Sequence, residues 1–103
     1  MEEKINNIIE KIDTLHLEDP KIYDYWDEMA SVLSSNKRET LLYLYHLNDP
    51  NTVLNISSVF EEMAIAFKTQ DIICCFKYLQ EKFPHLPLNA SVEVASAIIN
   101  HEK

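Results

Sequence analysis

Glycine is absent from this chain of 103 residues. Glycine supplies positive φ angles at low cost, and tight β-hairpins, phosphate-binding loops and dinucleotide-binding fingerprints depend on it. None of these features is therefore expected. A helical chain can do without glycine, because asparagine, aspartate and proline serve at its joints. No stretch alternates between apolar and polar residues over the length of a strand, so we expect an all-α fold.

Cysteine is nearly absent, with only Cys74 and Cys75 present. The two residues are consecutive within a helical pattern, and successive positions of a helix point about 100° apart. Neither a disulfide nor shared metal binding between them is expected. We interpret them as core or core-edge thiols, which fits a reducing compartment.

Basic residues are also few, with nine Lys and Arg against 17 Asp and Glu, which leaves a formal net charge of −8. A field of this sign repels nucleic acid and anionic membranes and attracts basic proteins, although the same charge also serves plain solubility. The first residues, MEEKINNIIEK, are charged and amphipathic. They form neither a signal peptide nor a membrane span, so a cytoplasmic location is expected.

What the chain does have is apolar residues, at 47% of the total, which is enough for one core. We predict a single domain over residues 1–103. Apolar residues recur at helical spacing in six segments, and short connections make successive helices antiparallel. The sequence thus predicts about six helices in three antiparallel pairs, over residues 3–15, 20–34, 37–47, 53–67, 71–83 and 90–101.

Two helix starts have the same form, Asp19–Pro20 and Asp49–Pro50, and they lie 30 residues apart. In each, a carboxylate cap precedes the residue best tolerated in the first turn. The repeat of this device suggests a duplicated helical hairpin, as in a short HEAT-like stack. The side chains around the two starts do not otherwise match, which favours an irregular bundle. We also expect Asn36 and Asn89 to cap helices.

The apolar stripes predict which residues face the core. In the third helix these are Leu41, Leu44 and Tyr45, with Leu42 and Leu47 as further candidates. In the first and fourth helices the stripes are continuous, and they comprise Ile5, Ile8, Ile9, Ile12 and Leu15, and then Val53, Ile56, Val59, Phe60, Met63 and Phe67.

No residues are grouped as a catalytic or metal site would require. The histidines His16, His46, His85 and His101 fall in joints or near helix ends, without a second ligand at i+3 or i+4. Adjacent acids, such as Glu61 and Glu62, lie on outward faces, where a carboxyl group stays solvated. We therefore expect no catalytic residue, no metal and no cofactor.

The helix over residues 53–67 has a mixed outer face. Leu54 and Ile65 lie roughly opposite its core stripe, beside Ser57, Ser58, Glu61 and Glu62. Either this helix is central and buries both sides, or the outer face binds a partner by apolar contact and by ion pairs with its basic residues. The second helix raises the same question with aromatic and acidic residues. The candidate contacts are Ser58, Glu61 and Glu62, together with Tyr23, Asp24, Asp27 and Glu28.

The stretch VLNISSVFEEMAIAFKTQDIICCFKYLQEKFPHLPL resembles small acidic helical proteins encoded beside bacterial toxins, the immunity proteins of polymorphic and contact-dependent growth inhibition systems. The features that carry the resemblance are SSVFEEMA, the polar break KTQ and LQEKFPHL. The resemblance implies a non-catalytic inhibitor that binds one cognate toxin, and the charge suggests a basic toxin such as a nuclease. A HEAT-like adaptor that binds another cellular protein is the alternative.

Overall fold

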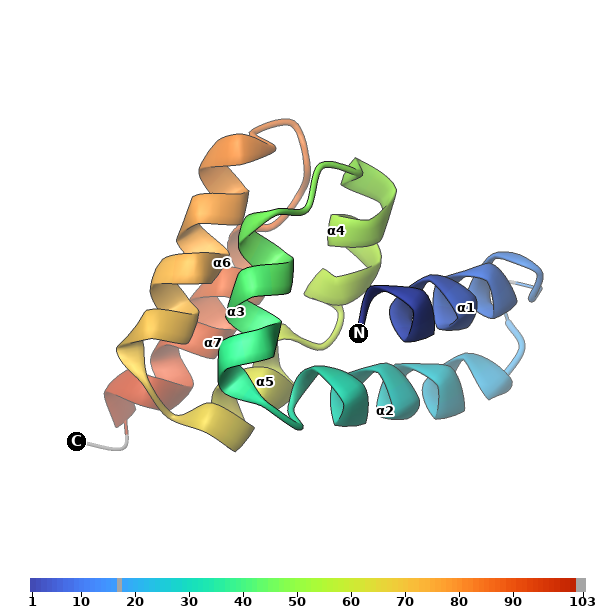
Figure 1. Cartoon of the computed structure of the whole chain (residues 1–103), viewed down its shortest axis with the longest axis horizontal. Helices are drawn as coiled ribbons and strands as arrows, with labels where there is room; N and C mark the ends of the chain where they lie inside the picture. The colour runs from blue at the N-terminus through green and yellow to red at the C-terminus, as the bar shows by residue number, and fades with distance from the viewer. Residues whose placement is uncertain (17, 102–103) are drawn as a thin grey trace.

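The computed structural model describes residues 1–16 and 18–101 and folds them into seven helices without a strand (Figure 1). The predicted all-α class is therefore confirmed. The helices are α1 (Glu2–Asp13), α2 (Lys21–Leu33), α3 (Lys37–Tyr45), α4 (Pro50–Ser57), α5 (Phe60–Phe67), α6 (Gln70–Lys82) and α7 (Asn89–His101).

Side chains cap the helices at two of the four predicted starts, those at Asn36 and Asp49. The side-chain oxygen of Asn36 accepts from the Glu39 N–H at 3.1 Å, and that of Asp49 accepts from the Asn51 N–H at 3.3 Å. Asp19 accepts from the Lys21 N–H, but the N-cap of α2 is Pro20, so the predicted cap is displaced by one residue. Each carboxamide or carboxylate thus satisfies an N–H that the first turn leaves unpaired. The prediction for Asn89 is wrong, because Asn89 is itself the first residue of α7 and its side chain accepts a hydrogen bond from the Gln80 amide.

The helix predicted over residues 53–67 is two helices, so the expected number of six is wrong. At the break, the Ser57 hydroxyl donates to the Leu54 carbonyl at 2.6 Å, and the N–H groups of Ser58 and Val59 bond to carbonyls three residues back. Tighter turns and a serine that competes for a carbonyl both end α-helical hydrogen bonding. The helical spacing of apolar residues continues unchanged across the break, on Val53, Ile56, Val59 and Phe60, so the sequence pattern does not reveal it.

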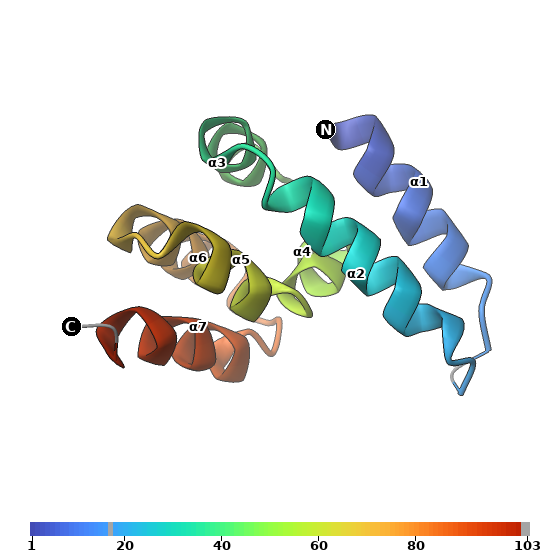
Figure 2. The same cartoon turned by 90° about the horizontal axis from the view of Figure 1, so that it is seen from below.

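Antiparallel packing joins α1 to α2, and it joins α6 to both α5 and α7. α1 and α2 lie side by side at one end of the molecule (Figures 1 and 2). α6 and α7 are antiparallel because Gln70 and Gln80, near the start and end of α6, bond to Asn100 and Asn89, near the end and start of α7.

Other helices pack in parallel, so the chain does not divide into three separate antiparallel pairs as predicted. Lys37 and Asp71 join the first turns of α3 and α6 at 2.9 Å, and Tyr45 and Tyr78 join their later turns with ring centroids 5.0 Å apart. α5 and α7 make the most extensive contact between any two helices, and they run in the same direction because both are antiparallel to α6. The break before α5 allows this arrangement, since it frees α5 from the direction of α4.

The helices that follow the two Asp-Pro starts differ in length, with 13 residues in α2 and 8 in α4. A stack of equal hairpins would need similar elements after each start. The observed lengths favour the irregular bundle.

The core is built on the predicted stripes of α1, α4 and α5, which are buried except for Phe67 and Leu15. Both are partly exposed, and Leu15 lies beyond the end of α1. At its centre the rings of Phe60 and Phe76 stack at 3.9 Å, and both residues are fully buried. No helix in the described part of the chain is long and apolar enough to cross a membrane.

The core face of α3 differs from the prediction. Leu44 and Leu47 are buried, but Tyr45 and Leu42 are exposed, and Thr40 takes a core position instead. The Thr40 hydroxyl donates to the Leu33 carbonyl at the end of α2, at 2.6 Å. A buried hydroxyl is tolerated when it is hydrogen-bonded, so the end of α2 decides which face of α3 turns inward.

Candidate functional site

The four candidate residues of α2, Tyr23, Asp24, Asp27 and Glu28, are all exposed. Tyr23 is 64% exposed, and its ring stands edge-on to the partly buried Trp26, with centroids 5.5 Å apart and an interplanar angle of 85°. The contact with the Trp26 ring therefore restricts the orientation of the exposed Tyr23 ring beside the carboxylates of α2.

The other three candidates lie at the start of α5. Ser58 precedes the helix, and Glu61 and Glu62 lie in its first turn, where both are exposed. The N-terminal residue before α5 is Val59, which offers no side-chain cap. Carboxylates near an uncapped helix start stabilise it through the helix dipole, by about 0.3–1 kcal/mol each. Glu61 and Glu62 thus stabilise the start of α5, and a binding experiment must separate this structural effect from a direct contact with a partner.

Ser58 and Glu61 border a small hollow of about 190 Å³ between the starts of α5 and α7. The parallel course of these helices brings their first turns together, and α7 contributes Ala90, Ser91 and Val94 to the wall. Glu62 and the four α2 residues lie outside this hollow. α2 and α5 do pack against each other, so the two candidate groups come from neighbouring helices.

Leu54 and Ile65, the apolar residues of the mixed face, are 40% and 50% exposed. α5 does contact other helices on several sides, including α2, α6 and α7. Leu54 and Ile65 are nevertheless left outside those contacts, so burial of both sides does not explain them. Val94 of α7 is 46% exposed nearby on the hollow, which adds an apolar side chain to the same region.

The five candidate carboxylates take part in no hydrogen bond or ion pair with another described residue; they are Asp24, Asp27, Glu28, Glu61 and Glu62. The ion pair that the structure does show, between Lys37 and Asp71, lies on the α3–α6 side. There a hydrogen bond from Thr69, together with the contact to Lys37, lowers the pKa of Asp71. The negative charge on α2 and α5 is therefore not neutralised within the described part of the chain.

The thiols do not form a reactive pair. Cys74 is exposed and Cys75 is buried, and burial raises the pKa of the Cys75 thiol to about 12. Because a thiolate is the reactive form, Cys75 is inert at neutral pH. Within residues 1–16 and 18–100, no three His, Cys, Asp or Glu side chains are grouped as a metal ion would require. The side chain of His101 lies outside the described part.

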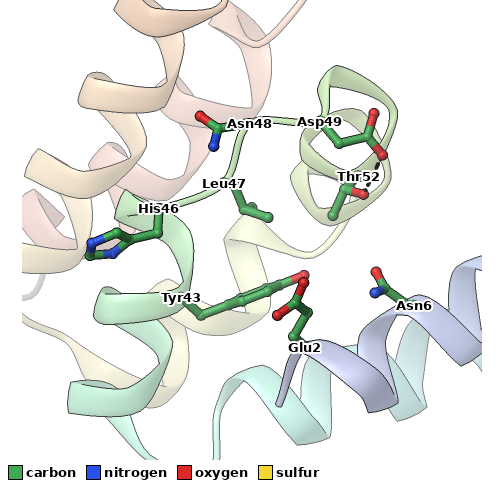
Figure 3. A pocket seen from close by; sticks show the side chains of 8 residues that line it. All are labelled: Glu2, Asn6, Tyr43, His46, Leu47, Asn48, Asp49 and Thr52. Atoms are coloured by element: carbon green, nitrogen blue, oxygen red, sulfur yellow. Dashed lines mark hydrogen bonds between the residues drawn. The ribbon is translucent and has the colours of Figure 1, made fainter.

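A second, polar hollow of about 440 Å³ was not expected from the sequence. It lies between the start of α1, the end of α3 and the start of α4, and Figure 3 shows its eight lining residues. The Tyr43 ring extends across it, and the Tyr43 hydroxyl oxygen is buried without a hydrogen-bond partner among the described residues. The only signal in the sequence is the Asp49–Pro50 start, which does not reveal that α1 lies beside it.

This hollow also contains a histidine, but not as part of an acid–base pair. The Nδ1 atom of His46 lies 2.8 Å from the Leu42 carbonyl, and the ring points away from Glu2 and Asp49 (Figure 3). A general base must lie within hydrogen-bond reach of its partner, and this arrangement does not provide that.

Comparison with protein-family models, with curated proteins and with solved structures finds no match to this chain.

Proposed function

We propose that this protein is an immunity-type inhibitor that binds one cognate bacterial toxin domain through the acidic surface of α2 and α5. The observation that carries the proposal is the set of five exposed carboxylates on α2 and α5 that have no partner among the described residues. The same two helices expose Tyr23 and Ile65, and Leu54 is exposed on the preceding helix α4. Protein interfaces combine apolar anchors with complementary charge. The proposed inhibitor has no catalytic residue and no cofactor.

The expected partner is basic. A net charge of −8 speeds encounter with a positively charged protein over distances of about a Debye length. A nuclease is a suitable example, because its substrate-binding surface is positive where it meets phosphate. An acidic inhibitor that covers such a surface replaces the phosphates with carboxylates. Tyr23, supported by Trp26, is the type of rigid aromatic group that often dominates binding energy.

The first experiment tests the function. The protein is coexpressed with the product of the adjoining reading frame, and growth and copurification are measured. We expect the neighbouring product to inhibit growth alone and to copurify stoichiometrically, without toxicity, when this protein is present. A neighbour that is harmless by itself, or toxic regardless of this protein, contradicts the proposal.

The second experiment tests the surface, with the variant Glu61→Lys/Glu62→Lys. The control is Glu10→Lys/Asp13→Lys on the exposed face of α1, which changes the net charge by the same amount. We expect the α5 variant to weaken binding by at least about tenfold and to reduce its salt dependence, and the control to change affinity by less than about threefold. Equal effects of both variants would show that only net charge matters.

Because both glutamates lie in the first turn of α5, lysine there also opposes the helix dipole. Glu61→Gln/Glu62→Gln removes the charge without this repulsion. Thermal unfolding of each variant separates lost stability from lost contact. If binding is lost only in variants that are unfolded at the assay temperature, the carboxylates have no direct role.

An adaptor function, in which the chain binds another cellular protein unrelated to toxins, is the second candidate. A different surface favours it: Leu42, Tyr45 and Tyr78 are exposed on α3 and α6, where they are 57%, 37% and 41% accessible. Apolar groups gathered in this way mark binding surfaces. A partner whose affinity falls with Tyr78→Ala but not with Glu61→Lys/Glu62→Lys would favour the adaptor.

A further inference from the structure

We propose that the polar hollow between α1, α3 and α4 binds an organic cation, a primary ammonium or a guanidinium group, between the carboxylates of Glu2 and Asp49. This inference is independent of the proposed function, because the hollow involves α1, α3 and α4, whereas the acidic surface involves α2 and α5.

The balance of charge and hydrogen-bonding groups in the wall indicates the class of ligand. In the described part of the chain, the wall contains two carboxylates and no lysine or arginine. Its lining residues are Glu2, Asn6, Tyr43, His46, Leu47, Asn48, Asp49 and Thr52. Carboxylates only accept, and the two asparagines add carbonyl acceptors. Acceptors joined to negative charge suit a positively charged donor, and hydrogen bonds to ionised groups are the strong ones.

Asp49 is held in place before any ligand arrives. One of its oxygens accepts from the Thr52 hydroxyl at 2.8 Å, and the other accepts from the Asn51 N–H at 3.3 Å. A carboxylate oriented by its own hydrogen bonds loses little freedom when a ligand binds, and pre-organisation of this kind favours affinity.

The Tyr43 hydroxyl is the independent observation that points to a ligand. Its oxygen is buried and has no hydrogen-bond partner among the described residues, although nearly all buried polar groups in proteins have a partner. Burial, and then the charges of Glu2 and Asp49, raise the pKa of Tyr43 to about 12, so the hydroxyl stays protonated at neutral pH. An ammonium or guanidinium N–H would supply the donor that its oxygen lacks.

A ligand reaches this oxygen only if a side chain at the rim moves, because the oxygen is already covered. Glu2 is exposed and is drawn beside the hydroxyl in Figure 3. A glutamate on the first turn of a helix can change rotamer at small cost. The cation would then lie between Glu2, Asp49 and Tyr43.

The volume of about 440 Å³ falls within the range of small-molecule sites. Two sources can supply the same chemistry: a free diamine, or the head group of a lysine or arginine on another protein. The probes are therefore 1,4-diaminobutane, n-butylammonium and n-butylguanidinium, with acetate as the anionic control. Each is titrated into the isotope-labelled protein and followed by NMR.

We expect saturable shifts for at least one cationic probe, with a Kd on the order of 1 mM, centred on Asn6, Tyr43 and Thr52. Tighter binding of the diamine than of n-butylammonium, by tenfold or more, identifies the free dication as the ligand. Similar affinities identify a single head group, as on a protein side chain. No saturable shift up to about 50 mM of any cation, or a stronger response to acetate, overturns the proposal.

Asp49→Asn is the decisive variant because asparagine caps a helix about as well as aspartate, so the charge is removed and the cap is kept. Asp19→Asn makes the same change at the other Asp-Pro start, away from the hollow. We expect probe affinity to fall about tenfold with Asp49→Asn and with Glu2→Gln, and less than twofold with Asp19→Asn.

Tyr43→Phe keeps the ring and removes only the hydroxyl, and we expect it to weaken binding about threefold or more. Melting temperatures and amide spectra of the unliganded variants show whether each one is folded. Equal losses for Asp49→Asn and Asp19→Asn would mean that the cations respond to overall charge, and the proposed site would then be rejected.

Discussion

The stacked pair Phe60–Phe76 allows a quantitative test of the core. Phe60 is the first residue of α5 and Phe76 lies in the middle of α6, and both side chains are fully buried. Their ring centroids are 3.9 Å apart with an interplanar angle of 11°. The perturbation is Phe60→Leu and Phe76→Leu, alone and together, because leucine keeps an apolar side chain at each position and removes the ring.

The expected size follows from the burial of both rings. Truncating a buried phenylalanine to alanine costs about 3–5 kcal/mol, so the smaller change to leucine should cost about 1–2 kcal/mol at each position. Either substitution alone already abolishes the stack, which is worth about 0.5–1.5 kcal/mol beyond buried area. The double variant should therefore be less destabilised than the sum of the singles by about that amount.

Urea unfolding measures these free energies, followed by far-UV circular dichroism and by the fluorescence of Trp26, the one tryptophan. A domain of this size has a total stability of about 5–15 kcal/mol, so the variants remain folded in water. The matched control combines Phe76→Leu with Ile9→Val in α1, which packs on α2 and α4. The changes in unfolding free energy caused by these two substitutions should add to within about 0.5 kcal/mol.

Additive costs for the two phenylalanines, or a cost below about 0.5 kcal/mol for Phe60→Leu, would refute the stacked arrangement. The result also bears on the candidate surface. α5 has only eight residues and begins with Phe60, so this contact positions Glu61 and Glu62.

Three further predictions concern single sites. A thiol reagent should modify one equivalent of cysteine quickly in the native protein, at Cys74, and reach the buried Cys75 only on unfolding; rapid reaction of two equivalents would contradict its burial. Folding raises the pKa of Cys75 from 9.0 and of Tyr43 from 10.0, each to about 12, so the neutral forms favour the folded state. Stability should then be unaffected by these groups below about pH 9 and fall as the pH rises towards 12, and urea midpoints should fall less steeply in Cys75→Ala and Tyr43→Phe. Finally, Lys68 ends α5 in the left-handed region with φ of 50°, so Lys68→Gly should exceed Lys68→Ala in stability by about 1 kcal/mol, measured by thermal melts. Because both variants lack the lysine side chain, the comparison reports on the backbone alone. A more stable alanine variant would contradict a strained backbone at this position.

Much of the candidate surface could be predicted from the sequence. The helical spacing places Leu54 and Ile65 off the core stripe, and the structure leaves them exposed, as it does Tyr23 and the acids of α2. The hollow between Ser58, Glu61 and α7 could not be predicted from the sequence, because it depends on the parallel packing of α5 and α7. The function of this surface stays a prediction until a partner is measured.

The sequence by itself determined the all-helical class, the caps at Asn36 and Asp49 and the inward stripe of α1. These features depend on residues within one or two turns of each other, so spacing and local hydrogen bonding are sufficient to predict them. The tertiary structure alone decided that α5 runs parallel to α7, that Thr40 rather than Tyr45 enters the core, and that Tyr43 meets Glu2 and Asp49 across a hollow. In each case neighbouring residues leave several outcomes of similar local energy, and packing between helices far apart in the chain selects one.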